Sequence, residues 1–309
     1  MRNNPKIGLV TITYNSSDVI DDFLSSVKGQ TYKNLKLYVV DNNSADNTLD
    51  KVLLVQSGID TAMIRNDINA GVAAGNNQGI KKALEENCDY IMLVNNDTVF
   101  EEKLVEKLVN YLMKENISIV APKMMYYDEP ERIWYGGGKL NRWRGYLNEH
   151  CGFKELDRGQ FKTGMEITYA PTCCVLFHYQ VFKDIGLMDE KYFVYFDDTD
   201  FFYRILIDGK HKMRFYNDVK FYHKVGSLSI SRIGKGESIK FSIFKIHYSI
   251  RNMVYYFLKQ KNAYTYFYMS YMIFKLHILL IMSARYRNSD ASYMDLYKYL
   301  YYGFRLYLS

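Results

Sequence analysis

The sequence contains few of the residues that constrain a chain covalently or rigidly. Only 4 of its 309 residues are Cys and only 4 are Pro. Four cysteines, two of them adjacent at Cys173 and Cys174, are too few for a disulfide framework and favour a reducing compartment. The N-terminus lacks an apolar stretch of the signal-peptide type, which predicts a cytoplasmic chain. A hydrophobic fraction of 48% excludes wholesale disorder.

Two common nucleotide-binding signatures are also absent. No GxxxxGK[ST] run occurs, which excludes a P-loop. The glycine-rich turn of a dinucleotide-binding domain belongs after the first strand, where this chain has Thr13-Tyr14-Asn15-Ser16-Ser17. Its glycines lie in the stretch 69–79 instead, after the third expected strand, so a nucleotide-dependent oxidoreductase is disfavoured.

Acidic residues are missing from the stretch 238–289. From residue 224 onward the chain carries 13 Lys and Arg against 3 Asp and Glu, whereas residues 1–223 carry 27 against 31. The chain is also rich in Tyr, with 30 residues. A basic, aromatic tail behind an acidic body suits a partner that combines negative charge with an apolar layer. An anionic membrane surface fits this description better than nucleic acid.

The stretch Ala263–Ala284 has 22 residues, a length that could span a bilayer. Lys275 and His277 lie within it and argue against a simple span. We therefore expect an interfacial helix that docks on a membrane. A helix bundle that forms a homodimer is the second interpretation, and a true span is the third.

Expected strands and helices alternate through the first 120 residues. Short β-rich apolar runs predict the strands, and apolar residues at helical spacing predict the helices between them. The expected strands are Ile7–Thr13, Leu35–Val40, Thr61–Arg65, Tyr90–Val94 and Ile117–Ala121, and the expected helices are Ser17–Lys28, Ser44–Gln56, Val72–Asn87 and Glu101–Glu115. This alternation predicts an α/β fold with a mostly parallel, doubly wound, Rossmann-like sheet.

The rest of the chain is patterned differently. Residues 122–165 contain both Trp residues and three successive glycines, and they predict a loop-rich insertion with a hairpin. Two further strands, Ile167–His178 and Met213–Tyr222, and two short helices, Tyr179–Ile185 and Thr199–Ile207, are expected next. The pattern after Gly226 is helical to the end. We expect an α/β domain over residues 1–226 and a helical C-terminal region over 227–309.

Small polar residues follow each of the first four expected strands. They are Thr13, Tyr14 and Asn15 after the first strand, Asp41 and Asn43 after the second, Arg65 and Asn69 after the third, and Asn95, Asn96 and Asp97 after the fourth. Ligands bind at the carboxyl ends of the strands in open α/β sheets. Any one cluster is explained by turns or helix caps. Four in succession favour a shared ligand site.

The glycine-rich stretch 69–79 permits a close approach of backbone to a ligand. It contains Gly71, Gly75 and Asn77, and the helix that it opens could receive a phosphate at its N-terminus. Asp97 beside two asparagines is a reasonable ligand for Mg²⁺ or Mn²⁺, which also accept diphosphate oxygens. His223 ends an expected strand and is a candidate second ligand, although a structural histidine there is equally compatible with the pattern.

The densest acidic cluster is Asp197-Asp198-Thr199-Asp200, at the start of an expected helix. Acidic residues in a first helical turn interact favourably with the helix dipole, which is the simplest interpretation. Three carboxylates in four residues exceed what a cap requires. Crowding raises at least one carboxyl pKa, which suits a general base.

Seven motifs in this order resemble those of family 2 glycosyltransferases with the GT-A fold, in the rhamnosyltransferase-like and galactofuranosyltransferase-like branch. The matching stretches are residues 10–15 (VTITYN), 39–44 (VVDNNS), 69–79 (NAGVAAGNNQG), 93–97 (LVNND), 186–193 (GLMDEKYF), 196–200 (FDDTD) and 223–227 (HKVGS). The resemblance extends over residues 6–255. It implies a GT-A domain, a nucleotide-sugar donor and inverting transfer.

The resemblance also implies roles for individual residues. Thr13, Asn15 and Asp41 would hold the nucleoside of the donor, and Arg65, Gly71, Gly75 and Asn77 would line the donor pocket. Residues 95–97 stand where the family often has Asp-x-Asp, so that Asp97 is the remaining carboxylate and His223 is the second metal ligand. Asp198 matches the catalytic base, with Asp197 as the fallback.

The expected function is single-sugar transfer from dTDP-rhamnose or a UDP-sugar to a cell-surface polysaccharide or a lipid-linked oligosaccharide. Processive synthases of the family carry a Gln-x-x-Arg-Trp motif, which does not occur at Arg142-Trp143. The enzyme is expected at the inner face of the cell membrane. The alternative is a non-catalytic sugar-nucleotide-binding or scaffold protein, which the substitution of Asn95 into the Asp-x-Asp position supports.

Overall fold

The computed structural model describes residues 4–55, 58–225, 235–284 and 293–309. At its centre is a seven-stranded sheet in the order β12-β6-β11-β4-β1-β2-β3. These strands are β1 (Ile7–Thr13), β2 (Leu35–Asp41), β3 (Thr61–Arg65), β4 (Tyr90–Val94), β6 (Ile119–Pro122), β11 (Cys174–His178) and β12 (Met213–Tyr216). Strands β1, β3 and β4 begin and end where the sequence predicts.

The sheet is mixed but mostly parallel, which confirms the predicted α/β class. β1 pairs in parallel with β2 and β4, β2 with β3, and β6 with β12. β11 is inserted antiparallel between β4 and β6. The expected strand Ile167–His178 is thus too long, since only its last five residues form β11. Pro171 precedes them and cannot donate a ladder hydrogen bond.

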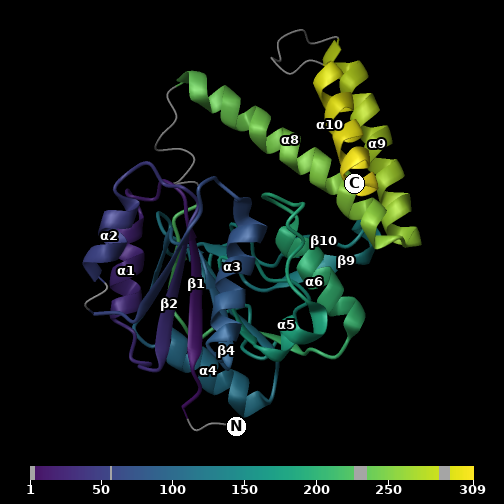
Figure 1. Ribbon diagram of the computed structural model, residues 1–309. Coiled ribbons are helices and arrows are strands. Elements are labelled where there is room, and N and C mark those ends of the chain that lie inside the picture. The colour runs from purple at the N-terminus through teal and green to yellow at the C-terminus, as the bar shows by residue number, and fades with distance from the viewer. Residues whose placement is uncertain (1–3, 56–57, 226–234, 285–292) are drawn as a thin grey trace.

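The helices of the α/β domain lie against this sheet (Figure 1). They are α1 (Ile20–Lys28), α2 (Thr48–Val55), α3 (Gly71–Glu85), α4 (Leu104–Glu115), α5 (Gln180–Ile185) and α6 (Asp197–Asp208). α3 packs across β1, β2 and β4. Its Gly79 makes this approach possible, because a Cβ there would lie 2.3 Å from Cγ1 of Val10.

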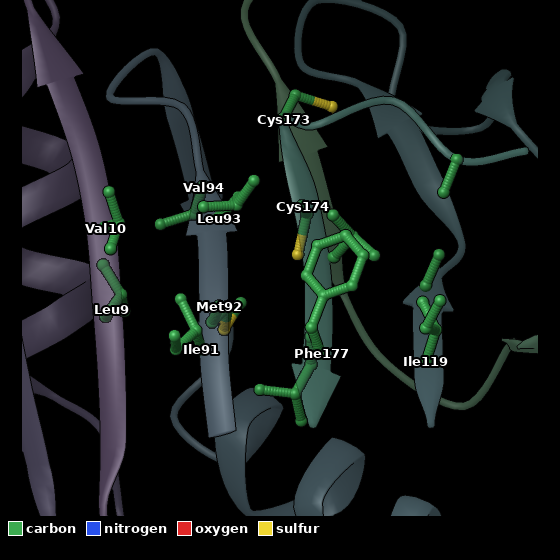
Figure 2. Packing of buried hydrophobic residues seen from close by; sticks show 14 of the residues in the cluster. Leu9, Val10, Ile91, Met92, Leu93, Val94, Ile119, Cys173, Cys174 and Phe177 are labelled. Carbon is green, nitrogen blue, oxygen red and sulfur yellow. The ribbon is translucent and has the colours of Figure 1, made fainter. Parts of the chain in front are cut away.

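The core is formed by near-continuous apolar runs on β1, β4 and β11. Figure 2 shows Leu9 and Val10 of β1 beside residues 91–94 of β4, with Cys174 and Phe177 of β11 next to them. All of these side chains are at most 2% exposed. Strands buried on both faces read as continuous apolar runs, which is why the sequence located them well.

A second sheet of four strands, in the order β5-β13-β7-β8, lies beside the first. Its strands are β5 (Thr98–Phe100), β7 (Met124–Tyr126), β8 (Ile133–Tyr135) and β13 (Phe221–His223). The single strand expected over Met213–Tyr222 is therefore wrong. The stretch turns at residues 217–220, so that β12 joins the large sheet and β13 the small one. The turn residues Asn217 and Asp218 favour such a break.

The insertion contains the predicted hairpin. β9 (Gly138–Asn141) pairs antiparallel with β10 (Leu147–His150), and the connecting turn includes the short 3₁₀ helix η1 (Arg142–Arg144). The same insertion also supplies β7 and β8, which the loop-rich expectation did not anticipate. Both Trp residues lie here, Trp134 on β8 and Trp143 on η1.

The C-terminal region is helical, as the sequence predicts. It consists of α8 (Lys235–Gln260), α9 (Ala263–Ala284) and α10 (Tyr293–Leu308). α8 packs against both α9 and α10, and α9 also contacts η1. Figure 1 shows α9 and α10 side by side above β9 and β10. Among the described residues, no helix combines the length and the apolar character that crossing a membrane would require.

Candidate active site

The carboxyl ends of β1 and β2 are joined by the buried carboxylate of Asp41. Thr13 donates its hydroxyl to Oδ1 of Asp41 over 2.7 Å. Ser44 donates its backbone N–H (2.9 Å) and its hydroxyl (2.5 Å) to the same carboxylate. Since Thr13 and Asp41 are paired in register and both are buried, their positions are fixed by the sheet.

The loops after β1 and β2 are also bonded to each other. Asn15 has left-handed backbone (φ 50°), donates its N–H to the Ser44 hydroxyl over 2.9 Å, and accepts the N–H of Ala45 on its side-chain oxygen over 2.7 Å. Asn43 is left-handed as well (φ 66°), and it is exposed like Tyr14. Asn tolerates this conformation better than most residues, which explains the asparagines at both loops.

The third strand end leads into α3. Arg65 is exposed at the end of β3, and the side chain of Asn69 accepts the N–H of Gly71 over 3.0 Å. Gly71 has φ 85°, and a Cβ there would lie 2.4 Å from the carbonyl oxygen of Phe193. Only glycine fits at this contact. Any other residue would be strained at this positive φ, and its Cβ would collide with the backbone of Phe193. The N-terminus of α3 is thus pressed against residue 193.

Gly75 and Asn77 lie deeper in α3 and contact protein. A Cβ at Gly75 would lie 3.1 Å from Ile12. Asn77 accepts the N–H of Met188 over 2.9 Å and donates to the carbonyl of Met188 and the carboxylate of Glu190, both over 2.8 Å. These bonds anchor residues 188–190 to the helix. That Gly75 and Asn77 line a donor pocket stays a prediction.

Residues 95–97 follow β4 at the centre of the sheet edge. Asn95 is exposed, whereas Asn96 is buried and donates to the carbonyl of Ile12 over 2.6 Å and to the Ser16 hydroxyl over 3.0 Å. Asn96 therefore ties β4 to the loop after β1. Asp97 is 6% exposed, and the next residue begins β5.

The small sheet places His223 beside Asp97. β13 pairs antiparallel with β5, so that His223 lies opposite Thr98. Its Nε2 is 3.3 Å from Oδ1 of Asp97. Within the described part of the chain, neither Oδ1 of Asp97 nor Nδ1 of His223 makes a hydrogen bond, although both atoms are buried. Buried polar atoms without partners are rare in proteins, so these two atoms are candidates for contact with a ligand, a water or an ion.

A continuous run of aromatic contacts connects His223 to Asp198. The ring of Trp134 lies 4.4 Å from that of His223 and 5.1 Å from that of His150. His150 stacks on Tyr169 with 5.7 Å between ring centroids, and the hydroxyl of Tyr169 donates to Oδ2 of Asp198 over 2.6 Å. These contacts link the pair Asp97 and His223 to Asp198, and that the three line one catalytic pocket stays a prediction.

The two predicted catalytic carboxylates begin α6 in different surroundings. Asp198 is half-buried and accepts hydrogen bonds from the Tyr169 hydroxyl and from the N–H of Thr199, each over 2.6 Å. Asp197 is 4% exposed, and its Oδ2 has no hydrogen-bond partner among the described residues. The carboxylate that an acceptor could reach is therefore that of Asp198.

Burial raises the pKa of both carboxyl groups. For Asp197 burial is the largest cause and the charge of Asp198 is the next, and together they raise its pKa well above the usual range. Burial also raises the pKa of Asp198, while hydrogen bonds from Tyr169 and Thr199 oppose the rise. A raised pKa makes a carboxylate a stronger proton acceptor, which is the property that a general base needs.

The backbone that leads into α6 is strained. Tyr195 (φ 64°) and Phe196 (φ 69°) are successive left-handed residues, and neither is glycine. Each costs on the order of 1–3 kcal/mol, so the conformation must be imposed by its surroundings. Strain of this kind concentrates at functional sites, and here it immediately precedes Asp197.

Sequence reasoning missed Trp134, His150 and Tyr169, which connect the two halves of the site. Tyr169 has a recognisable signal, because it lies in the expected strand Ile167–His178. His150 has no comparable signal, and neither does Trp134, which lies in the same stretch 122–165 that the sequence presents as loop-rich. Its position depends on the pairing of β8 with β7, a contact within the small sheet.

The residues around Asp97 suit a divalent cation. A buried carboxylate oxygen and an imidazole nitrogen are accepted ligands of Mn²⁺, and Mg²⁺ accepts the carboxylate. Among the described residues no group of three His, Cys, Asp or Glu side chains is arranged to hold a metal. The protein can supply two ligands here, which leaves the other positions for water or substrate oxygens.

Comparison with known proteins supports the resemblance inferred from the motifs. Residues 9–186 match the family model for glycosyl transferase family 2. A dTDP-rhamnosyl transferase, RfbF of Shigella flexneri, is 26% identical over 262 residues, which cover 84% of this chain and 81% of the relative. A low-salt glycan biosynthesis hexosyltransferase, Agl10 of Haloferax volcanii, is 24% identical over 64% of this chain and 61% of the relative.

Solved structures show the same fold. TarS residues 1–349 of S. aureus align with a TM-score of 0.55 and 17% identity, over 72% of this chain and 61% of that one. GalNAc-T7 with UDP, GalNAc and Mn²⁺ aligns with a TM-score of 0.57 and 16% identity, over 72% and 44%. The mannosyltransferase PcManGT of Pyrobaculum calidifontis, in complex with GDP-Man and Mn²⁺, aligns with a TM-score of 0.56 and 14% identity. The alignment covers 83% of this chain and 64% of that one. The fold is GT-A.

Replacing the buried Asp197 by Asn is expected to stabilise the protein increasingly as the pH rises. Because the pKa of Asp197 is raised in the fold, the native state binds its proton more tightly than the unfolded chain does. Stability is then lost as pH rises above about 4, where the unfolded carboxyl ionises. Asn does not titrate, so the Asn variant avoids this loss. Each unit by which the folded-state pKa exceeds the unfolded-state pKa corresponds to about 1.4 kcal/mol in the free energy of unfolding.

Urea unfolding of Asp197→Asn and of the wild type at pH 5 and pH 8 measures this effect. The gain in the free energy of unfolding that Asp197→Asn brings should be larger at pH 8 than at pH 5. Asp67→Asn changes an exposed carboxylate and serves as the control, for which no such trend is expected. Equal pH trends in both variants would contradict the assignment.

Proposed function

We propose that this chain, which belongs to glycosyltransferase family 2, transfers one sugar from a nucleotide-sugar donor to an acceptor hydroxyl with inversion at the anomeric carbon. One observation supports the proposal: a run of contacts through Trp134, His150 and Tyr169 joins the pair Asp97 and His223 to Asp198. A donor held at the sheet edge would then lie between a charge-neutralising group and a base.

The strand-end residues are proposed to bind the donor. Thr13, Asn15 and Asp41 would hold the nucleoside, with Tyr14 and Asn43 exposed beside them. The further donor-site residues proposed are Arg65, Asn69, Gly71, Gly75, Asn77, Asn95 and Asn96. The similarity to RfbF favours dTDP-rhamnose, and the TarS structures with UDP and UDP-GlcNAc leave a UDP-sugar as the other candidate. The acceptor is proposed to be a cell-surface polysaccharide or a lipid-linked oligosaccharide.

Asp198 is proposed to act as the general base. Its Oδ2 is held by the Tyr169 hydroxyl and its Oδ1 by the N–H of Thr199, so its orientation is set before an acceptor arrives. The carboxylate takes the proton of the acceptor hydroxyl as that oxygen attacks the anomeric carbon from the face opposite the diphosphate. Asp197 is the fallback, although its burial leaves it less accessible.

Mg²⁺ or Mn²⁺ is proposed at Asp97 and His223, where the buried Oδ1 of Asp97 lies 3.3 Å from Nε2 of His223 and has no hydrogen-bond partner among the described residues. A cation there would neutralise charge on the departing diphosphate. The protein positions Asp97 through the neighbouring residue. Asn96 donates to the carbonyl of Ile12 and to the hydroxyl of Ser16, which fixes the loop after β4 that carries Asp97.

The C-terminal region is proposed to dock on an anionic membrane surface. Along α9, Phe267, Tyr271, Phe274 and Ile278 recur every three or four residues and are 75, 48, 64 and 41% exposed. They form an apolar stripe on one face of the helix. No acidic residue occurs between positions 237 and 290, so the charge of this stretch complements anionic lipid.

Two further elements support the same surface. α10 carries a similar stripe, formed by Tyr297, Tyr301, Phe304 and Leu308, all at least 40% exposed. Trp143 of η1, 66% exposed, lies 5.3 Å from the ring of Tyr264 on α9, with the guanidinium of Arg142 above it. Trp and Tyr favour the membrane interface, and this arrangement would hold the enzyme at the inner face of the membrane beside a lipid-linked acceptor.

Asp198→Asn tests the catalytic assignment. It should retain donor binding and lower the transfer rate by about 10²- to 10⁴-fold, the usual contribution of a general base. A screen of dTDP- and UDP-sugars with the wild type and Mn²⁺ identifies the donor first. Asp208→Asn makes the same change at the other end of α6 and should keep full activity.

An Asp198→Asn protein that transfers sugar at the wild-type rate would overturn the assignment of Asp198 as the base. A wild-type protein that binds a donor but never transfers its sugar would favour the non-catalytic scaffold interpretation.

The metal assignment has a test that does not depend on turnover. Donor affinity, measured by calorimetry, should rise when Mn²⁺ is added to the wild type. In Asp97→Asn the rise should be lost, and in His223→Gln it should be reduced, while affinity without metal stays near that of the wild type. An undiminished response to Mn²⁺ in both variants would place the cation elsewhere.

Vesicle flotation tests the membrane surface. The wild type should float with vesicles containing phosphatidylglycerol and bind far less to phosphatidylcholine alone. Phe267→Ser with Phe274→Ser should lose most of this binding. Leu54→Ser with Ile207→Ser removes apolar side chains that are 79 and 62% exposed on other helices and should bind like the wild type. No flotation, together with a dimer that dissociates in the Phe double variant, would identify the stripe as a homodimer interface instead.

A further inference from the structure

One face of α8 covers the whole segment that leads into the catalytic helix. Ring contacts join Tyr248 to Phe193 (5.2 Å) and Tyr255 to Tyr192 (5.0 Å). The helix residues in contact with residues 189–200 include Phe244, Tyr248, Arg251, Asn252, Tyr255, Tyr256, Lys259 and Gln260. These residues recur at intervals of one, three or four along α8, which places them on a single face of the helix.

Asn252 is at the centre of this face. It is fully buried, and its side-chain nitrogen donates to the carbonyl of Val194 over 2.7 Å and to the carbonyl of Tyr195 over 2.9 Å. Its side-chain oxygen accepts from Arg251 over 2.8 Å. Asn is a poor residue for a helix interior by propensity, so a buried one here needs a reason outside the helix. The two carbonyls provide it.

These carbonyls belong to the strained turn before Asp197. Tyr195 and Phe196 are both left-handed, and the N–H of Asp200 bonds to the carbonyl of Phe196 over 2.9 Å to start α6. On the other side, the carbonyl of Phe193 accepts the N–H of Val72 over 2.6 Å. The segment thus connects the N-terminus of α3 to the N-terminus of α6, and Asn252 bonds to its middle.

We infer that Asn252 is a positioning residue for catalysis, which holds residues 194–196 in the left-handed turn that directs Asp198 towards Tyr169. Because Asn252 is fully buried, it would act through the turn and not by contact with a substrate. Its action on the reaction rests on the proposed function of Asp198, whereas its action on the turn does not. A helix of the C-terminal region therefore supplies a part of the catalytic geometry.

The test compares two buried amides that have the same bonding. Asn252→Asp replaces the NH₂ group, which donates both hydrogen bonds, by one carboxylate oxygen that faces the two carbonyls, at nearly constant shape. Gln30 is 2% exposed, and its nitrogen donates to the carbonyls of Ser26 and Glu101, both over 2.9 Å, far along the chain from the turn. Gln30→Glu is the matched control. Asn252→Ala removes the donors without adding charge, in case the Asp variant does not fold.

Hydrogen–deuterium exchange of the full-length protein reports on the turn directly. The Asn252 variants should exchange residues 193–200 at least tenfold faster than the wild type, and Gln30→Glu should leave that segment unchanged. In transfer assays kcat should fall at least tenfold further in the Asn252 variants than in Gln30→Glu. The nucleotide-binding stoichiometry should stay at one per chain, which excludes a loss of folded protein.

Unchanged exchange over residues 193–200 would overturn the inference, and so would a kcat loss no larger than that of Gln30→Glu. A loss of binding sites in proportion to activity would also overturn it, because the effect would then be unfolding. If the wild type transfers no sugar, the proposed function fails separately, and faster exchange in the Asn252 variants would still support the structural part.

Discussion

The structure around α6, the helix that carries the proposed base, depends on the fully buried carboxylate of Asp200. A buried carboxylate costs several kcal/mol unless cations and hydrogen bonds surround it. Here Arg204 donates over 3.1 Å, Lys259 over 2.9 Å and Gln260 over 2.8 Å. Two of these three donors come from α8, so α6 in its native position requires the docked C-terminal helix.

The same helix compensates the strain next to Asp200. Two left-handed residues cost on the order of 2–6 kcal/mol together, and a hydrogen bond to a backbone carbonyl returns about 1 kcal/mol. The two bonds from Asn252 are therefore too weak alone. The ion pair of Lys259 with Asp189 (2.7 Å) and the ring packing along α8 supply the rest. The whole face of α8 therefore holds the turn, and Asn252 sets the orientation of the Val194 and Tyr195 carbonyls within it.

The sequence predicted what local pattern determines and missed what depends on pairing between distant segments. β1, β3 and β4 are continuous apolar runs, and their limits were predicted correctly. The strand-end pattern named Asp97 and His223 as candidate ligands, but it could not place them side by side, because their proximity rests on the pairing of β5 with β13. The expected strand over Met213–Tyr222 has strand-like alternation on both sides of residues 217–220, so alternation alone could not reveal two strands.

The positioning function of α8 could not be predicted either, and the reason is physical. Its basic and aromatic composition is explained equally well by a membrane surface, and composition does not say which face of a helix looks inward. In the structure α8 directs its polar and aromatic contacts towards residues 189–200, while α9 and α10 carry exposed apolar stripes. Since α8 packs against both of those helices, it connects the proposed docking helices to the turn before α6.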